Sequence, residues 1–254
     1  MIGFQEVQEP NLTTYQDRLD GYDHVPGNLY GDAEPTERTA ILWRIARLEL
    51  LAAGEFWHSR TPDQPSTDWE VPYPMGATWG KLRCRDSGTP LLHLNSHLDD
   101  DSPLSRLAAT KLICARVARL QDGGQPAIVT ADFNGNPWHP PSRVFVDHNV
   151  VDVYRAAGHA DSAAARMLHG LRGDAYFALE WGREVFWRVD WILTHPGAKG
   201  IQVTSCTIVR DAQPPLYPSD HYPVVAELRL PSARNDVAAD PEAIVSSCPY
   251  HTMR

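Results

Sequence analysis

The chain lacks several features that would assign it to a specialised class of protein. Its four cysteines, Cys84, Cys114, Cys206 and Cys248, form neither a CxxC pair nor another metal-finger spacing. It has no run of about 18 apolar residues that could span a membrane, and its start carries no charged leader followed by an apolar segment. We therefore expect a soluble, intracellular, cytoplasmic protein with free thiols and no membrane contact.

An excess of positive charge is missing too. The chain has 23 Lys and Arg against 32 Asp and Glu, which gives a formal net charge of -9 at pH 7. Proteins that bind nucleic acid through its phosphates need a basic surface to displace counterions, so this charge argues against binding to duplex DNA. It is neutral toward a small phosphorylated substrate. A Gly-x-Ser-x-Gly elbow is also absent, which excludes a serine hydrolase of that type.

The composition favours a folded domain. Hydrophobic residues make up 43% of the 254 residues and aromatic residues 9%, which is enough for a packed core. Strand-like and helix-like segments alternate without a linker or a repeat, as is typical of an α/β domain. We expect this domain over residues 1–231. Residues 232–254 lose all periodicity, and we expect them to form a loose tail.

Hydrophobic periodicity predicts the positions of the elements. Strands are expected at residues 2–5, 39–43, 47–52, 77–85, 91–96, 127–130, 184–194, 201–209 and 222–230. One helix is expected through Leu12, Tyr15 and Leu19, and a second from its N-cap, Ser102, to about Leu120. Residues 39–43 are expected to pair with residues 47–52. The strands at 77–85 and 91–96 should form a hairpin.

Five short polar clusters lie at the ends of these strands or inside them. In chain order they are Gln5-Glu6, Asn95-Ser96-His97-Leu98-Asp99, Asp132-Phe133-Asn134, Arg188-Val189-Asp190-Trp191 and Ser219-Asp220-His221. Together they supply carboxylates, amides and imidazoles, a set that suits a hard metal ion and a phosphate.

Asp132 and Asn134 follow an apolar strand, and side chains two apart in an extended chain point the same way. The aspartate is suited to orient or deprotonate an attacking water. The amide is suited to donate to a phosphoryl oxygen as charge builds up. A strand-ending Asx turn is the alternative that the same residues allow.

Residues 91–98 alternate, so that His93, Asn95 and His97 share one face of a strand. Three polar residues opposite a face of mostly leucine predict a solvated groove. An ordinary solvent-facing strand surface is the alternative, and for His93 it is the preferred one.

Two further positions suit proton transfer and metal binding. Asp190 lies in mid-strand between large apolar residues, where an unpaired charge is costly, so a histidine or metal partner is expected. His221 precedes a strand and can handle protons near pH 7, while the adjacent Asp220 is suited to bind a metal. The alternative for Asp220 is a loop aspartate that caps a turn.

The order and flanks of these clusters resemble the endonuclease/exonuclease/phosphatase family, the superfamily that includes DNase I-like nucleases. The sharpest match is Ser219-Asp220-His221-Tyr222-Pro223, and the segments around His97 and Asp132 are similar to the family's own. The resemblance extends from Ile2 to about Leu230. It is closest to the compact microbial branch grouped with CCR4-like proteins, whose activities include 3'-5' exonuclease action on RNA.

The resemblance implies an α/β (α+β) fold in which two packed β-sheets form a DNase I-like sandwich with helices on its outer faces. It implies a hydrolase of phosphodiester bonds that depends on Mg²⁺, or alternatively Mn²⁺, and that acts as a 3'-5' exoribonuclease. The alternatives are a phosphatase or phosphodiesterase on a small soluble phosphoester, and a truncated, inactive binding protein. The expected partner is RNA or a small molecule rather than duplex DNA.

The resemblance also implies roles for single residues. The catalytic residues would be His97, Asp132, Asn134, Asp190 and His221, with His221 the partner of Asp190, and the metal ligands Glu6 and Asp220. Asn95 would bind the phosphate or support the site. Glu37 would orient His97; an ion pair with Arg38 or Arg44 is the alternative.

The family's first strand, which carries an asparagine, has no counterpart here, because the chain opens at Met1-Ile2-Gly3-Phe4-Gln5-Glu6. We therefore expect the strand at residues 2–5 to expose backbone groups and apolar area. A monomer is expected if this start is complete.

Overall fold

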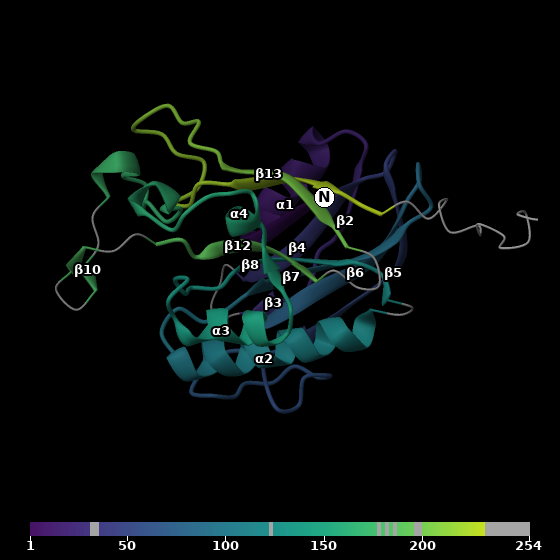
Figure 1. Cartoon of the computed structure of the whole chain (residues 1–254), viewed down its shortest axis with the longest axis horizontal. Coiled ribbons are helices and arrows are strands. Elements are labelled where there is room, and N and C mark those ends of the chain that lie inside the picture. Colours follow the sequence, from purple (N-terminus) through teal and green to yellow (C-terminus); the bar gives the residue numbers. More distant parts are fainter. Residues whose placement is uncertain are drawn as a thin grey trace, which may run out of the picture.

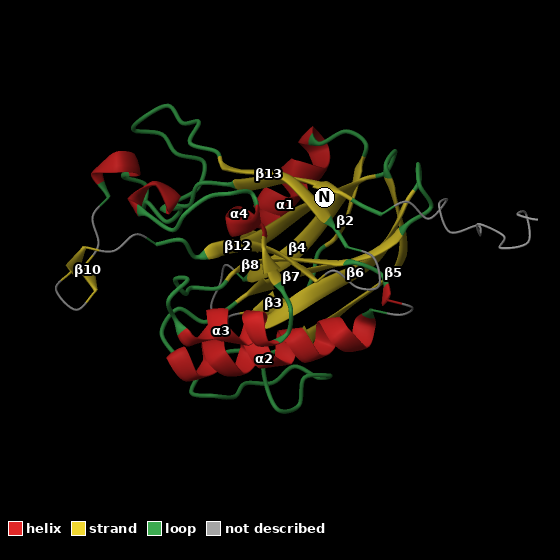
Figure 2. Cartoon of the chain, viewed as in Figure 1, coloured by secondary structure: helices red, strands yellow, loops and turns green. Residues whose placement is uncertain are grey.

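Two packed β-sheets form the body of the molecule. The computed structural model describes residues 1–30, 36–121, 124–176, 179–180, 183–184, 187–195 and 200–231. Within them the two sheets lie face to face and helices cover their outer sides (Figure 1 and Figure 2). This arrangement confirms the predicted sandwich. The tail predicted at residues 232–254 lies outside the described residues.

The smaller sheet is built around β4. Its strands are β1 (Ile2–Gln8), β4 (Glu37–Arg44), β2 (Tyr22–Val25) and β3 (Leu29–Tyr30). Helix α1 (Glu9–Arg18) covers its outer face, where Leu12 packs with Leu42. Ile41 and Trp43 alternate with Leu42 and face the larger sheet. Because both faces of β4 are covered, its sequence is apolar almost throughout.

The larger sheet carries β7 in its interior. Its strands, in spatial order, are β5 (Leu48–Trp57), β6 (Gly76–Cys84), β7 (Pro90–His97), β8 (Ala127–Asp132), β12 (Asp190–His195) and β9 (Val151–Asp152). Helices α2 (Pro103–Leu120) and α3 (Pro140–Asp147) cover its outer face (Figure 1). Ser102 caps α2 by accepting the backbone N–H of Ser105, which confirms the predicted start. The β6–β7 hairpin is confirmed as well.

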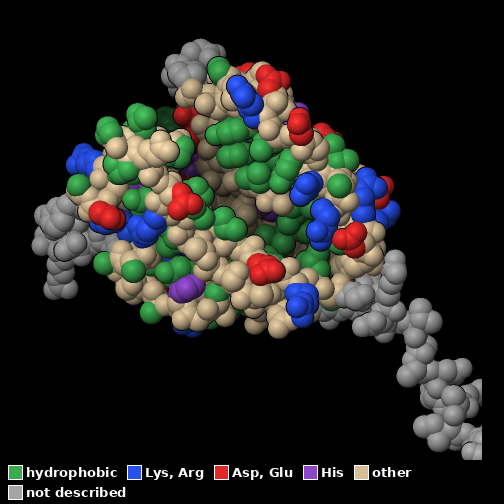
Figure 3. All heavy atoms as spheres, turned by 90° about the horizontal axis from the view of Figure 1, so that it is seen from above, with side chains coloured by type: hydrophobic (Ala, Val, Ile, Leu, Met, Phe, Trp, Pro, Cys, Tyr) green, Lys and Arg blue, Asp and Glu red, His purple; other side chains and the backbone are tan. Residues whose placement is uncertain are grey.

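The remaining elements lie around this sandwich. They are the short helix α4 (Val153–Ala156), two 3₁₀ turns (Ala163–Ala165 and Gly173–Ala175), and the strand pairs β10 (Leu179–Glu180) with β11 (Arg183–Glu184) and β13 (Gln202–Ile208) with β14 (Val224–Arg229). Among the described strands, β1 pairs only with β4 and β14 only with β13. Seen from above, the surface is hollowed and apolar side chains gather around the hollow (Figure 3). No helix in the described ranges is both long and apolar enough to cross a membrane.

One predicted strand pairing is wrong. The strands expected at residues 39–43 and 47–52 exist, as β4 and β5, but they do not pair with each other. β4 pairs with β1, β2 and β3, whereas β5 pairs with β6. The turn between them carries the chain from one sheet of the sandwich to the other. Strands that are adjacent in sequence often pair, but local periodicity does not specify which layer a strand joins.

The predicted solvated groove on β7 is also corrected. His93, Asn95 and His97 are only 1%, 0% and 7% exposed, because the smaller sheet covers the face of β7 on which they lie. Hydrogen bonds replace the water: His93 contacts the hydroxyl of Thr130. Burial lowers the pKa of His93 to about 3, so this ring is neutral at physiological pH.

The strand predicted at residues 184–194 is divided. Glu184 belongs to β11, and β12 begins only at Asp190. Asp190 therefore lies at the end of a strand and not in the middle of one. This position places it at the edge of the sheet, where its carboxylate reaches a partner.

A close approach of β1 to the larger sheet provides a test of this packing. A Cβ atom on Gly3 would lie 2.2 Å from Oγ1 of Thr130 and 2.5 Å from Oδ1 of Asn95. We expect Gly3→Ala to destabilise the fold by about 1–3 kcal/mol, because the crowded side chains must shift. Gly200→Ala is the matched control, since its Cβ meets nothing within 4 Å. Denaturant unfolding that gives equal free energies for the two variants would contradict the packing.

Candidate active site

Three of the predicted polar residues meet at one edge of the larger sheet. β7 and β8 are parallel, and their last residues, His97 and Asp132, are register partners. β12 is antiparallel to β8, so its first residue, Asp190, is the partner of Asp132 on the other side. The direction of the strands thus brings residues from distant parts of the sequence into one row.

Asn134 joins this row through a turn. Its backbone N–H donates to the Asp132 carboxylate at 2.7 Å, and its side-chain amide donates to the carbonyl of Leu98 at 2.8 Å. The same amide nitrogen lies 3.1 Å from Nε2 of His97. The Asx turn considered as an alternative is therefore present, and it is this turn that brings Asn134 to His97.

His97 lies between two carboxylates. Its Nε2 atom is 3.6 Å from a carboxylate oxygen of Glu6 and 3.6 Å from one of Asp132. Glu6 reaches it from a bulge in β1, where the pairing with β4 shifts register. Glu6 and Asn134 both have left-handed backbones, with φ of 52° and 44°. Such conformations cost about 1–3 kcal/mol in non-glycine residues and are concentrated at functional sites.

Asp190 and His221 form a hydrogen-bonded pair. Nδ1 of His221 lies 2.8 Å from a carboxylate oxygen of Asp190, which confirms the predicted contact. Burial alone would lower the pKa of His221. The charge and hydrogen bond of Asp190, together with the charges of Asp132 and Asp220, outweigh burial and raise it to about 10. His221 therefore carries a proton at neutral pH.

The pKa of Asp132 is raised too, which for a carboxyl group favours the neutral form. Burial raises its pKa, and the nearby Asp190 carboxylate raises it further. His97 and His221 oppose the rise, and the resulting pKa is about 6. A carboxyl group that titrates this close to neutrality is suited to accept a proton from water.

The site offers donors for a divalent metal. Asp132, Asp190 and His221 each present one ligand atom, and these atoms lie within 4.8 Å of one another. This group would bind a metal only after His221 gives up its proton. Glu6, the expected ligand, offers a carboxylate that is 57% exposed and that raises the pKa of the neighbouring Glu37. A hard cation beside Glu6 and Glu37 would be held by both carboxylate groups.

Asn95, one of the two predicted supporting residues, lies between the two sheets. Asn95 is fully buried, and its amide is held by Gln5 and Thr130 and by the carbonyls of Phe4 and Ala40. It therefore fastens β1 to the larger sheet, which is a supporting position.

Glu37 lies close enough to Glu6 and His97 for their charges to affect it. Burial raises its pKa most, Glu6 raises it further, and His97 opposes the rise. Arg38, offered as an alternative partner, directs its guanidinium to Glu9 and to the carbonyl of Gly27.

The structure adds His169 as a supporting residue and gives a supporting role to Arg188, which belongs to the polar cluster around Asp190. His169 donates its backbone N–H to the carbonyl of Asp220, and its ring lies 4.1 Å from that of Tyr222. Arg188, two residues before Asp190, is fully buried and bonded to Asp152. The sequence signal for Arg188 is a charged residue in an apolar segment, where burial requires an ion-pair partner. No sequence signal links His169 to Asp220.

Comparison with known proteins agrees with this geometry. The sequence pattern of the Endonuclease/Exonuclease/phosphatase family matches residues 1–221. No curated protein matches the chain. The solved structures that are similar include a mannosyl-6-phosphatase of Bacteroides thetaiotaomicron, with 26% identity, a TM-score of 0.77, and coverage of 90% of this chain and 84% of that one.

Two other solved structures have the same fold. An endonuclease/exonuclease/phosphatase family protein from Bacteroides thetaiotaomicron is 28% identical, with a TM-score of 0.76 over 89% of this chain and 79% of that one. The catalytic domain of human Nocturnin with bound sulfate is 20% identical, with a TM-score of 0.66 over 90% of this chain and 80% of that one. At that identity the likeness to Nocturnin concerns the fold alone.

Proposed function

The chain belongs to the Endonuclease/Exonuclease/phosphatase family, and from that premise we propose that it is a divalent-metal-dependent phosphoesterase acting on a small soluble phosphoester. The observation that carries the proposal is the row of His97, Asp132 and Asp190 in register at one sheet edge, with His221 bonded to Asp190. Amide, imidazole and carboxylate groups gather there, a set of groups suited to bind and hydrolyse a phosphoester.

Each residue has a part in the proposed reaction. Asp132, with its pKa near 6, orients a water and takes its proton. Asn134 and His97 donate hydrogen bonds to the phosphoryl oxygens. His221, protonated and held by Asp190, stabilises the negative charge that builds up in the transition state.

We place the metal beside Glu6, which would hold it next to His97. The family resemblance also implies Asp220, which adjoins His221 and would be a ligand only for an ion at that end of the row. When bound, Mg²⁺ or Mn²⁺ supplies Lewis-acid polarisation of the phosphoryl group. The alternative position is the group of Asp132, Asp190 and His221, which would bind a metal only with His221 deprotonated.

Chelation tests the metal requirement. We expect hydrolysis of 4-nitrophenyl phosphate and bis(4-nitrophenyl) phosphate in the presence of Mg²⁺ or Mn²⁺. EDTA should reduce the rate by roughly 100-fold or more, and added metal should restore it. Activity that survives EDTA would refute the proposed mechanism.

The metal ligands can be assigned separately. Glu6→Gln should raise the Mg²⁺ concentration needed for half-maximal activity by roughly tenfold or more, because a carboxylate ligand becomes neutral. Glu9→Gln is the control, since Glu9 is exposed and paired with Arg38. If Asp190→Asn weakens Mg²⁺ binding in calorimetry and Glu6→Gln does not, the metal lies at the group around His221 instead.

The choice of a small phosphoester rests on charge and similarity. The net charge of -9 disfavours a polyanion. A mannosyl-6-phosphatase is among the similar structures above 25% identity. The second candidate is a 3'-5' exoribonuclease, which the resemblance to the CCR4-like branch favours. A panel of sugar phosphates, nucleotides and a short RNA decides between them by kcat/KM, and processive shortening of RNA from its 3' end would establish the second.

A further inference from the structure

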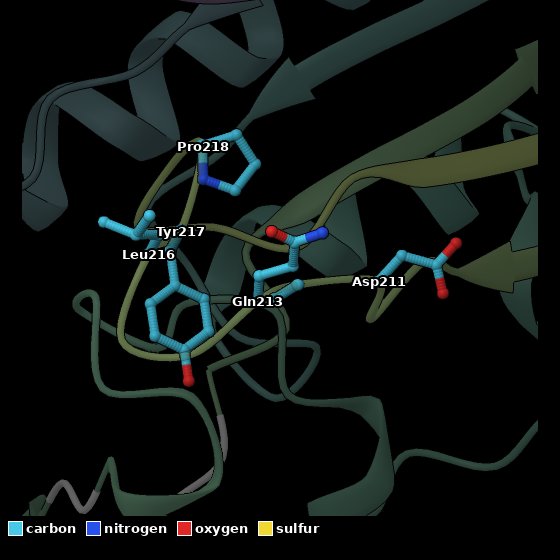
Figure 4. A pocket seen from close by; sticks show the side chains of 6 residues that line it. Asp211, Gln213, Leu216, Tyr217 and Pro218 are labelled. Atoms are coloured by element: carbon cyan, nitrogen blue, oxygen red, sulfur yellow. The ribbon is translucent and has the colours of Figure 1, made fainter.

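An open hollow lies in the loop that leads into the active site. It has a volume of about 650 Å³ and is lined by Asp211, Ala212, Gln213, Leu216, Tyr217 and Pro218. Figure 4 shows Leu216, Tyr217 and Pro218 at one end of it and Asp211 at the other, with Gln213 between them. The loop runs from β13 directly into Ser219, Asp220 and His221. The hollow therefore lies on the same loop as Asp220 and His221, and its last lining residue, Pro218, is three residues before His221.

The loop is anchored at its base, so the hollow is preformed. The guanidinium of Arg210 donates to the carbonyls of Ala164 and Arg166 and lies 4.6 Å from the ring centre of Tyr222. Within the loop, the backbone N–H of Leu216 donates to the carbonyl of Gln213 at 2.8 Å. A preformed site binds without the entropic cost of ordering a loop.

Tilted ring contacts connect the hollow to Tyr222, the residue after the catalytic histidine. The ring of Tyr217 lies 4.9 Å from that of His169, and the ring of His169 lies 4.1 Å from that of Tyr222. His169 also donates its backbone N–H to the carbonyl of Asp220 at 2.8 Å. The Tyr217 hydroxyl packs closely against Gly173, where a Cβ atom would lie 2.2 Å from it.

The lining has a chemistry that distinguishes between substrate classes. Asp211 offers a carboxylate and Gln213 an amide, which accept and donate hydrogen bonds from hydroxyl groups. Leu216, 73% exposed, and Pro218 offer apolar surface for the C–H face of a ring. None of the six lining residues is cationic, and the Asp211 carboxylate repels a second phosphate.

We propose that this hollow is the subsite for the leaving group and that it takes a neutral, polyhydroxylated ring, a sugar, in preference to a polynucleotide. The inference deepens the proposed function and rests on it, because the sugar would carry the phosphate that is hydrolysed at His221. Asp211 and Gln213 are then residues that determine specificity rather than catalytic residues.

The test compares substrates that do and do not carry a sugar. For Asp211→Asn and Gln213→Ala, kcat/KM on mannose 6-phosphate should fall by about tenfold, mainly through KM, because one hydrogen bond to hydroxyl groups is lost. The value on 4-nitrophenyl phosphate should change less than about twofold. Asp174→Asn, whose side chain is 92% exposed outside the hollow, is the control and should affect neither substrate.

Two results would overturn the subsite. An equal loss on both substrates would mean that the loop acts only by supporting His221. A wild type that prefers a short RNA over mannose 6-phosphate, with a preference unchanged in Asp211→Asn, would exclude a sugar site.

A wild type without turnover on any substrate or metal would refute the proposed function but not the subsite. In that case, calorimetric titration with mannose 6-phosphate would decide. Binding weakened by Asp211→Asn and not by Asp174→Asn supports the subsite, and equal or absent binding refutes it.

Discussion

Replacing His221 by alanine is expected to lower kcat by roughly 100- to 1,000-fold, the range typical of a lost donor that stabilises the charge of the transition state. The imidazole is held 2.8 Å from a carboxylate oxygen of Asp190. Steady-state kinetics on 4-nitrophenyl phosphate measures the effect. His24→Ala, which alters a histidine on β2, is the control and should retain full activity. A His221 variant within about threefold of wild type would exclude the histidine from the chemistry.

The partner of His221 can be tested through stability. Asp190→Asn preserves the shape of the side chain but removes the charge that raises the histidine pKa to about 10. Since the folded pKa lies above the ordinary value of 6.5, the pair stabilises the fold fully below pH 6.5 and progressively less as the pH rises through 10. The unfolding free energies of wild type and variant should therefore converge toward pH 10. A difference that is independent of pH would mean that the charge of Asp190 has no such role.

The largest loss of stability is expected from Arg188→Met. Arg188 is fully buried, with Nε 2.6 Å from Asp161 and a terminal nitrogen 2.5 Å from Asp152. Its guanidinium lies 4.5 Å from the ring centre of Trp191 and 5.2 Å from that of Tyr154. Removing it takes their buried partner away from two carboxylates whose side chains are only 14% and 15% exposed, which costs about 3–5 kcal/mol. For a chain of this size the melting temperature should fall by roughly 6–20 °C.

A nearby arginine provides the matched control. Arg155 also pairs with Asp161, but its side chain is 53% exposed. Arg155→Met should cost less than about 1 kcal/mol, as exposed ion pairs do. Adding Asp152→Asn and Asp161→Asn to Arg188→Met should recover part of the stability, because no charge is then left unpaired. Equal melting temperatures for the two arginine variants would refute the importance of burial here.

Local sequence correctly predicted the features that depend only on residues close together in the chain. The N-cap at Ser102, the β6–β7 hairpin and the period of α2 depend on neighbours in the chain, and all three were predicted. The same applies to Asp132 and Asn134, where one Asx turn joins the two residues. Such features need only the chemistry of a few consecutive residues.

Sequence could not decide which faces are covered. The alternation in β7 correctly placed His93, Asn95 and His97 on one face, but it predicted water there. The smaller sheet covers that face, so hydrogen bonds to Gln5, Thr130 and backbone carbonyls take the place of solvent. Alternation indicates that two faces differ, and only the packing of the second layer determines what each face meets.

By itself, then, the sequence determined the kinds of elements, the order of the polar clusters and the family to which they belong. The tertiary structure decided which sheet β4 and β5 join and where β12 begins, and it placed Asp190 beside Asp132. It also set the charge states, because the proton on His221 depends on carboxylates that come from different strands and loops. These properties arise from contacts between residues that are far apart in the chain, and no local pattern encodes the distance between them.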